Sequence, residues 1–345
     1  MLRIEMLPAC HGDSLLVEYG ATGPEHRVLI DGGARSAAPA VAARLAQIGA
    51  PAALDLVVVT HVDEDHIGGM LKLIAGHAFT AGDFWFNSYR HLFRPDRLGG
   101  VMGEQLSEAI RDARLPQNDR FAGRSVVVPD DGALPRVALP GGASITLVSP
   151  TWDKLERLQS AWEAECRNAG IAPGAGDRPA DVLGKRPPPA ALDVDQLLAA
   201  PFREDVSPAN GSSIAFVFEF EGKRALFGAD AHPGVVLDSL RRLSTAPVAL
   251  DAVKLCHHGS RNNTSADLLG HLACERFLIS SSGERFGHPD PETLARIVAR
   301  PGHKQVCFNY DSEYTNSWAS AALRRRHHYD VALPVDNRRG LVVEL

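Results

Sequence analysis

The chain has 345 residues, enough for one large domain or two smaller ones with a substantial core. Its formal net charge of −6 excludes a uniformly basic surface, so the protein as a whole would not attract nucleic acid or an anionic membrane. No segment approaches the roughly 20 consecutive apolar residues that span a bilayer. The first residues alternate like a strand and lack the apolar core of a signal peptide.

The five cysteines are scattered, without the spacing of a disulfide framework or a zinc motif. An odd, dispersed set of this kind favours reduced thiols. Together these features predict a cytoplasmic protein that does not contact a membrane. The cysteines are Cys10, Cys166, Cys256, Cys274 and Cys307.

The first 50 residues predict a small sheet followed by a helix. Residues 2–7 and 14–19 alternate between apolar and polar side chains, and residues 27–30 form a third short run. A helix is expected over residues 37–48, which are rich in alanine and carry Pro39 in the first turn. Strands joined first by hairpins and then by a helix favour a mixed sheet with helices on one side.

Residues 60–69 are the most informative stretch of the chain. They follow an apolar run at 56–59, which predicts a buried strand, and precede a helix expected at 70–74. His61 and Asp63 alternate and can point the same way, whereas Asp65 and His66 follow the bend and can face a second point. One turn can therefore supply ligands to two cations. Alternatively, the carboxylates only cap the helix, but capping does not explain the flanking imidazoles.

A basic cluster lies in the segment after this helix. Arg90, His91, Arg94 and Arg97 stand beside aromatic residues, ahead of a helix expected at 103–113 and strands expected at 125–128 and 143–148. The favoured interpretation is a solvated face with ordinary arginines. The alternative is a patch that holds a phosphate backbone near the metal ions.

Residues 151–209 differ in character from the rest. A helix is expected at 152–168, followed by Gly- and Pro-rich chain with three consecutive prolines at 187–189 and a short helix near 194–199. A long insertion in a compact domain is usually functional or a linker. We interpret it as a cap or lid over the site, within a single domain that spans residues 1–345. A disordered loop is the alternative.

The second half of the chain predicts another sheet, with strands at 213–220, 225–227, 252–255 and 276–280. Three of these strands end in a Gly-marked loop that carries an aspartate or histidines, namely Asp230, the His257–His258 pair and His288. Such loops place their side chains at one end of a sheet. His288 could also only cap a turn before the following proline. The two halves are expected to form layers packed face to face.

Short motifs within residues 11–14, 29–33, 61–69, 210–213, 228–230, 257–260 and 287–289, taken in this order, resemble those of the metallo-β-lactamase fold superfamily. Asp63 stands where the commonest superfamily loop has a second histidine, which resembles the ComEC-like branch, the class of the hydrolase domain in bacterial DNA-uptake competence proteins. The resemblance implies an α/β fold, a four-layer αβ/βα sandwich with metal ions at its open edge. The matching residues are His11-Gly12-Asp13-Ser14, Leu29-Ile30-Asp31-Gly32-Gly33, His61-x-Asp63-x-Asp65-His66-x-Gly68-Gly69, Asn210-x-x-Ser213, Gly228-x-Asp230, His257-His258-Gly259-Ser260 and Gly287-His288-Pro289.

The resemblance also implies two divalent metal ions, zinc or manganese. One histidine of the His257–His258 pair would complete the second site; we assign His258, although the sequence does not distinguish the two. Asn210 stands where many members supply a third histidine to the first ion, and asparagine is a poor zinc ligand, so the occupancy of that site is open. The implied ligands are His61 and Asp63 for the first ion, Asp65, His66 and His258 for the second, and Asp230 between them.

The function that follows is metal-dependent hydrolysis. A metal-bound hydroxide would attack, Asp65 would orient it, and His257 or His288 would protonate the leaving group near neutral pH. The leading hypothesis is a phosphodiesterase or nuclease with a nucleic acid or nucleotide as substrate. One alternative is hydrolysis of another ester, such as a phosphorylcholine ester, lactone or thioester; another is a binding module with purely structural metals. The sequence does not predict the oligomeric state.

Overall fold

The computed structural model describes residues 1–92, 102–169 and 192–345, which form two large and two small sheets. The first large sheet has six strands in the order β18-β1-β2-β3-β5-β7. Strands β1, β2 and β3 pair antiparallel, and β3, β5 and β7 pair parallel. Their bounds are β1 Leu2–Met6, β2 Leu15–Tyr19, β3 His26–Ile30, β5 Leu56–Val58, β7 Phe84–Trp85 and β18 Leu341–Glu344.

The second large sheet has eight strands in the order β17-β16-β15-β13-β11-β10-β9-β8. Strands β8 to β11 pair antiparallel, and β11, β13, β15, β16 and β17 pair parallel. Their bounds are β8 Arg136–Ala138, β9 Ser144–Ser149, β10 Ala215–Phe220, β11 Lys223–Phe227, β13 Ala252–Lys254, β15 Arg276–Ile279, β16 Lys304–Phe308 and β17 Tyr329–Ala332. The small sheets pair β4 Ala52–Leu54 with β6 Phe79–Ala81 and β12 Val248–Ala249 with β14 Leu272–Ala273.

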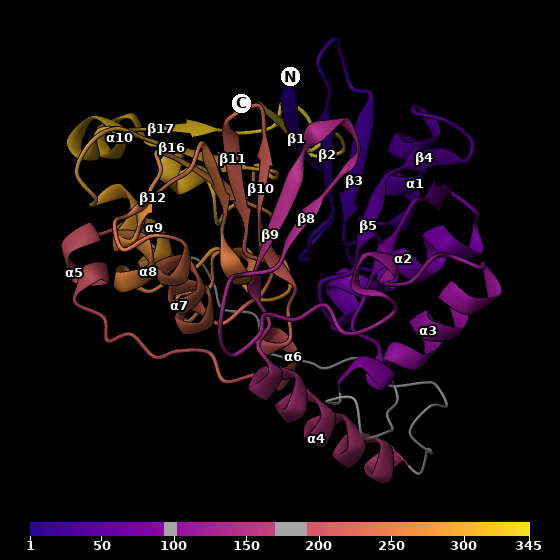
Figure 1. Cartoon of the computed structure of the whole chain (residues 1–345). Coiled ribbons are helices and arrows are strands. Elements are labelled where there is room, and N and C mark those ends of the chain that lie inside the picture. Colours follow the sequence, from indigo (N-terminus) through magenta and orange to yellow (C-terminus); the bar gives the residue numbers. More distant parts are fainter. Residues whose placement is uncertain (93–101, 170–191) are drawn as a thin grey trace.

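The two large sheets pack face to face and carry helices on their outer sides, so the expected four-layer sandwich is confirmed (Figure 1). Helices α1 to α3 cover the outer face of the first sheet, and Trp162 of α4 joins Val41 and Met70 in one buried apolar cluster. Helices α7 to α9 cover the second. The helices are α1 Ala38–Ala46, α2 Glu64–Ala75, α3 Met102–Asp112, α4 Trp152–Ala169, α5 Val194–Leu198, α6 Pro208–Gly211, α7 Pro233–Leu243, α8 Ala266–Gly270, α9 Pro291–Val298 and α10 Ala321–His327.

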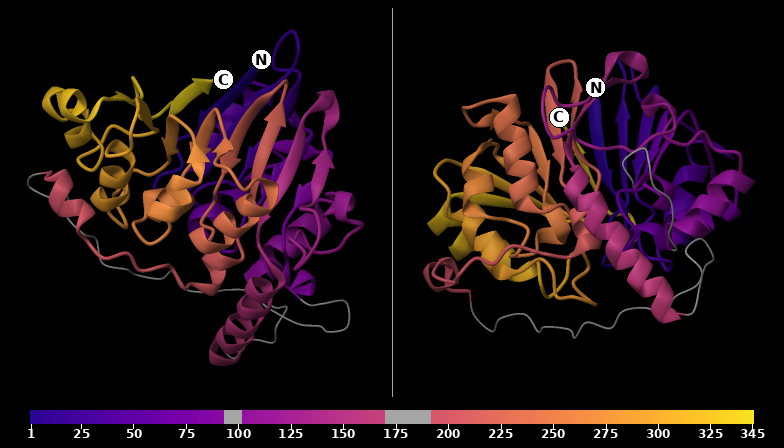
Figure 2. Two further views of the ribbon diagram at one scale, coloured as in Figure 1. Left: turned by 60° about the vertical axis from the view of Figure 1, so that its left-hand side comes forward. Right: turned by 60° about the horizontal axis from the view of Figure 1, so that its bottom comes forward.

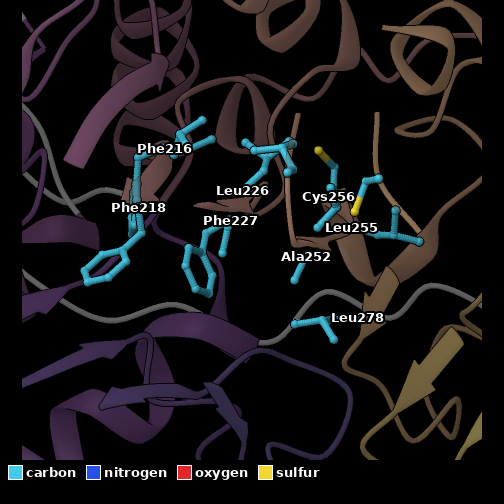
Figure 3. Close-up of a cluster of buried hydrophobic side chains, with 14 of the residues drawn as sticks. Phe216, Phe218, Leu226, Phe227, Ala252, Leu255, Cys256 and Leu278 are labelled. Atoms are coloured by element: carbon cyan, nitrogen blue, oxygen red, sulfur yellow. The ribbon is translucent and has the colours of Figure 1, made fainter. Parts of the chain in front are cut away.

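The inner faces of the sheets form the main core. Side chains that alternate along β1, such as Ile4 and Met6, are buried in the same cluster as Phe216 and Phe227 of the second sheet. The rings of Phe216 and Phe227 lie 5.4 Å apart. Figure 3 shows these two rings together with Phe218 and the apolar side chains of β11 and β13. Burial of this apolar surface on both sheets holds the two halves of the chain together.

The ends of the parallel strands decide where the functional residues lie. Because β11, β13 and β15 run parallel as neighbours, their carboxyl ends meet at one edge of the sheet. The loops after these strands carry Asp230, the His257–His258 pair and His288. Helices α4 and α6 pack against each other, and Figures 1 and 2 show them beyond the lower ends of the strands, away from the two chain termini.

Two sequence-based expectations need correction. Helix α2 begins at Glu64, so Asp65 and His66 lie in its first turn and not in the preceding loop; acidic residues favour a helix N-terminus, which explains the earlier start. Residues 125–128 do not form a strand and contribute only an isolated bridge from Val128. The backbone of Val126 bonds instead to the side-chain amide of Asn87, at 2.8 Å for both its N–H and its carbonyl.

Candidate metal centre

The carboxylate of Asp230 lies at the middle of the site, on the loop after β11, with 2% of the residue exposed. Its two oxygens face different histidines. Oδ2 lies 3.8 Å from Nε2 of His61 and 3.7 Å from Nε2 of His257. Oδ1 lies 3.4 Å from Nε2 of His66 and 3.6 Å from Nε2 of His258. One buried carboxylate therefore separates two pairs of imidazole nitrogens.

Each pair of imidazoles is accompanied by a further carboxylate from the start of α2, Asp63 at its N-cap or Asp65 in its first turn. On the Oδ2 side, Oδ2 of Asp63 lies 3.6 Å from Nε2 of His61. On the Oδ1 side, Oδ2 of Asp65 lies 3.5 Å from Nε2 of His258. Asp63 is the N-cap residue of α2, yet its side chain makes no capping hydrogen bond to the described backbone. Capping therefore does not account for Asp63.

Hydrogen bonds on the far side of each ring determine which nitrogen carries the proton. Nδ1 of His66 donates to Oδ2 of Asp31 at 2.8 Å. Nδ1 of His258 donates to the carbonyl of Ser280 at 2.9 Å. Nδ1 of His61 donates to the hydroxyl of Thr60 at 3.0 Å, since that hydroxyl itself donates to Asp31. The Nε2 lone pairs of all three rings therefore point toward Asp230.

This arrangement fits divalent metal ions. Nε2 of His66 and Nε2 of His258 are 3.3 Å apart, a separation that either a proton or a metal ion between the two nitrogens accommodates. Four-coordinate zinc with bonds of about 2.0–2.1 Å holds its ligand atoms about 3.3–3.4 Å apart. In the described part of the chain, Nε2 of His61 and Oδ1 of Asp230 are buried without a hydrogen-bond partner. Imidazole nitrogens and carboxylate oxygens suit zinc or manganese.

Close backbone packing lets Asp31 reach the site. A Cβ on Gly69 would come within 1.9 Å of the carbonyl oxygen of Gly32. The loop after β3 and the first turns of α2 can therefore lie this close only because both positions are glycine. Asp31 lies in this loop and accepts hydrogen bonds from the backbone N–H and the hydroxyl of Thr60, both at 2.8 Å. A carboxylate behind a ligating histidine orients the ring and raises its basicity.

A second buried carboxylate stands behind His258. Oδ1 of Asp13 lies 3.3 Å from Nδ1 of His258, and Oδ2 of Asp13 accepts a hydrogen bond from Nζ of Lys254 at 2.6 Å. Both side chains of this pair are almost fully buried. Burial alone would raise the pKa of Asp13, but the charges of Lys254 and His258 outweigh it and hold that pKa well below the usual range. The sequence analysis missed this pair, although a lysine inside the apolar strand β13 was a signal.

The charged groups at the centre shift one another's pKa values. Burial favours the neutral ring of His258, but the carboxylates of Asp230 and Asp13 outweigh burial and raise the pKa of His258 to about 10. The pKa of His66 is raised in the same way, since Asp230, Asp31 and Asp65 overcome its burial. A pocket that stabilises positive charge this strongly also favours metal cations.

The family follows from a comparison with known protein families. The sequence profile of the metallo-beta-lactamase superfamily matches residues 7–269. The chain belongs to the metallo-beta-lactamase superfamily. Its members are hydrolases, and their fold implies divalent metals. The ComEC-like branch remains a prediction.

Solved structures with the superfamily fold resemble this chain only distantly. YhfI from Bacillus subtilis shares 11% identity at a TM-score of 0.45, covering 100% of this chain and 99% of that one. Zn(2+)-bound PqqB from Methylobacterium extorquens shares 14% identity at a TM-score of 0.42, covering 97% of this chain and 88% of that one. The metallo hydrolase Igni18 from Ignicoccus hospitalis shares 11% identity at 0.41, covering 99% of each chain. A search of curated proteins found no match.

Asn210, at the position where many superfamily members carry a histidine, lies on α6 and is buried. Its Nδ2 donates to Oδ2 of Asp205 at 2.6 Å and lies 3.3 Å from Nδ1 of His257. Its Oδ1 is buried and has no hydrogen-bond partner within residues 1–92, 102–169 and 192–345. Asp205 was not predicted, because nothing in its local sequence distinguishes it.

A cluster of polar and aromatic side chains lies next to the metal centre on the side of Asp65. It consists of His11, Glu64, Arg285 and Phe286. Nη1 of Arg285 lies 3.2 Å from Nε2 of His11 and 3.4 Å from Oε2 of Glu64. The Arg285 guanidinium lies 5.1 Å from the ring of Phe286, which contacts His11 edge-on at 5.5 Å. The residues come from parts of the chain far apart in sequence, so no local pattern groups them.

The remaining predicted residues lie as follows. The ring of His288 lies 5.2 Å from that of His257 and 6.5 Å from that of His258. Burial, reinforced by the charges of these two rings, keeps the pKa of His288 well below its usual range. Arg90 donates to Gln117 at 2.6 Å and to His91 at 3.1 Å, and burial followed by the charge of Arg90 lowers the pKa of His91 to about 4. Arg94 and Arg97 lie outside the described residues.

None of the helices in the described parts of the chain has the length and apolar character needed to cross a membrane.

Proposed function

We propose that this member of the superfamily is a phosphodiesterase with a two-metal centre. One observation carries the proposal. The two oxygens of the buried Asp230 each face two imidazole nitrogens, and each group includes one more carboxylate, from Asp63 or Asp65. The residues that would hold the ions are His61, Asp63 and Asp230 on one side and Asp65, His66, His258 and Asp230 on the other.

When bound, two divalent ions lower the pKa of a water molecule and polarise the substrate oxygen. The chain itself holds the reactants and moves protons. Asp65 has a pKa below the usual range, because His66 and His258 outweigh the effect of its burial, so it is ionised at neutral pH and can accept a hydrogen bond from the attacking water. We assign proton donation to the leaving group to His288, whose ring lies 5.2 Å from that of His257. Because burial and the neighbouring imidazoles keep the pKa of His288 well below its usual range, the ring is neutral at pH 7 and would donate its N–H proton as a neutral imidazole.

The proposal of an anionic substrate is supported by the cluster of His11, Glu64, Arg285 and Phe286. Glu64 directly precedes the proposed ligand Asp65, and Nη1 of Arg285 pairs with Oε2 of Glu64 at 3.4 Å. A phosphodiester carries a negative charge on two non-bridging oxygens, which match the fork of a guanidinium. A lactone or neutral ester has no such charge. The aromatic ring of Phe286 offers a face for a nucleobase.

We also propose that residues 1–345 form one domain in which residues 151–209 border the site. Trp162 of α4 packs against Tyr89 with ring centres 5.5 Å apart, and Oδ2 of Asp205 lies 3.5 Å from Nδ1 of His257. The segment thus has contacts both with the first sheet's helices and with the metal centre. Its middle part, residues 170–191, lies outside the described residues.

The test is hydrolysis by metal-loaded protein of bis(p-nitrophenyl) phosphate, DNA and RNA, compared with p-nitrophenyl acetate and lactones. We expect turnover of the diesters that a chelator abolishes and that Asp230→Asn reduces at least about 100-fold, since the substitution removes the charge between the two ion sites. The matched control is Asp238→Asn on α7, whose side chain is exposed. Turnover of only neutral esters, or metal binding without any turnover, would refute the phosphodiesterase assignment.

A further inference from the structure

His257 is oriented from behind by amide and carboxylate groups. Its Nδ1 lies 3.0 Å from Oδ1 of Asn263. Nδ2 of Asn263 donates to Oδ2 of Asp205 at 2.9 Å and to the carbonyl of Asp230 at 3.2 Å, which assigns the two ends of the amide. Oδ1 of Asn263 is therefore an acceptor, so Nδ1 of His257 carries the proton. The lone pair of the ring is on Nε2, the atom 3.7 Å from Oδ2 of Asp230.

Asp205 accepts several of the hydrogen bonds in this network. Besides Asn263, its Oδ2 accepts the amide of Asn210 at 2.6 Å, and its Oδ1 accepts the backbone N–H of Ser207 at 2.8 Å. Oδ2 also lies 3.5 Å from Nδ1 of His257. These contacts hold its pKa well below the usual range, even though burial alone would raise it. An ionised carboxylate behind an imidazole is the arrangement found behind histidines that ligate metals.

The backbone turns both histidines of the pair toward Asp230. His257 and His258 have positive φ values of 46° and 53°, and Gly259 follows at 82°. Two successive residues with a Cβ in the left-handed region are unfavourable and persist where the surroundings enforce them. In this turn His258 faces Oδ1 of Asp230 while His257 faces Oδ2. The two adjacent rings thus serve opposite oxygens of one carboxylate.

The Oδ2 side has an incomplete set of nitrogen ligands without His257. Nε2 of His61 is buried, aims into this side and has no hydrogen-bond partner among the residues described. We propose that His257 is the second nitrogen ligand of the first metal ion, beside His61, Asp63 and Asp230, and that Asp205 is its positioning residue. The inference rests on the two-metal centre of the proposed function but not on its substrate.

In this arrangement the second histidine ligand of the first ion comes from the turn after β13 and not from α6. Asn210, which stands at the usual histidine position, holds Asp205 through its amide. His257 is then unavailable as the acid that protonates the leaving group, and each ion receives two imidazoles and two carboxylates. The segment 192–209 contacts the metal centre through Asp205, which lies behind His257.

Metal binding measured without substrate tests the proposal. Chelator-stripped protein is titrated with Zn²⁺ and Co²⁺ by calorimetry, metal content is measured after dialysis, and the visible spectrum of bound Co²⁺ is recorded. We expect two ions in the wild type and one in His257→Ala, with the Co²⁺ spectrum of the remaining ion unchanged. Asp205→Asn should keep both ions but weaken one of them roughly 10- to 100-fold. His303→Ala, at an exposed histidine that pairs with Asp330, is the matched control and should behave as wild type.

The outcomes separate this inference from the proposed function. Two ions of wild-type affinity in His257→Ala would overturn the assignment of His257 while leaving the two-metal centre intact. A single ion in the wild type would refute the two-metal centre and the inference with it. If His257→Ala loses its circular dichroism spectrum, Asp205→Asn decides, because wild-type affinity for both ions in that variant overturns the positioning role.

Discussion

The buried pair of Lys254 and Asp13 provides a quantitative test of how the centre is supported. Both side chains are almost fully buried, and Nζ of Lys254 donates to Oδ2 of Asp13 at 2.6 Å. Replacing Lys254 by methionine keeps the volume similar but leaves the Asp13 carboxylate with only the imidazoles of His258 and His66 to balance it. Breaking a buried pair from one side costs about 3–5 kcal/mol, because an uncompensated charge remains inside the protein. We expect Lys254→Met to lose stability by that amount.

The double variant Asp13→Asn with Lys254→Met removes both charges. Since replacing both partners is often close to neutral, we expect it to cost only about 0–2 kcal/mol, far less than the sum of the single variants. The matched control is Lys223→Met, which breaks an exposed lysine–aspartate pair of 3.0 Å with Asp251. Exposed pairs contribute at most about 1 kcal/mol.

The assay is urea denaturation of the chelator-treated protein at pH 7, followed by circular dichroism, with unfolding free energies from linear extrapolation. Asp13 has a lowered pKa in the folded state, so its contribution is fully present above the usual aspartate pKa of about 3.9 and is lost as the pH falls through the folded value. The difference between Lys254→Met and wild type should therefore shrink in acid. A loss below about 1 kcal/mol, or additive single and double variants, would refute the reasoning.

Three further predictions concern substrate, metal and cap. Arg285→Gln should lower kcat/KM for anionic diesters roughly 10- to 100-fold, because a charge-assisted contact is lost, and should spare neutral esters; Arg241→Gln on exposed α7 is the control. Stripped protein should regain more activity with Mn²⁺ than with Zn²⁺, since Asp63, Asp65 and Asp230 make the centre oxygen-rich; full activity with stoichiometric zinc and no gain from manganese would contradict this. Limited proteolysis should cut first within residues 170–189, and shortening them should change substrate preference more than thermal stability; a protease-resistant segment whose deletion unfolds the protein would exclude a cap.

Local sequence patterns were enough to predict the layers and the loops that meet. The alternation in β1 and β10 and the apolar runs in β5 and β13 depend on each strand's own burial, which short segments record. Parallel strands bring their carboxyl ends to one edge, so the loops carrying Asp230 and His258 could be expected to meet the loop at 60–69. The structure brings these side chains within 4 Å of one another.

The supporting residues could not be predicted, because their roles depend on contacts between distant parts of the chain. Asp13 and Lys254 are separated by 241 positions, and Arg285 and His11 by 274. Asp205 follows a Gly- and Pro-rich segment and is distinguished only by its contacts with Asn210 and Asn263. The difference between His257 and His258 depends on backbone angles in a left-handed turn, which the residue types do not encode.

The charges of the centre explain how one set of side chains can exist both with and without metal. Asp65 and Asp230 have pKa values below the usual range, because the effect of burial is outweighed by His66 and His258. The same carboxylates raise the pKa values of these histidines, that of His258 to about 10. Protons on the two rings therefore balance the buried carboxylates in the metal-free chain, and the fold can form before metal arrives. A divalent ion must then displace these protons, so metal binding at this centre releases protons and weakens as the pH falls.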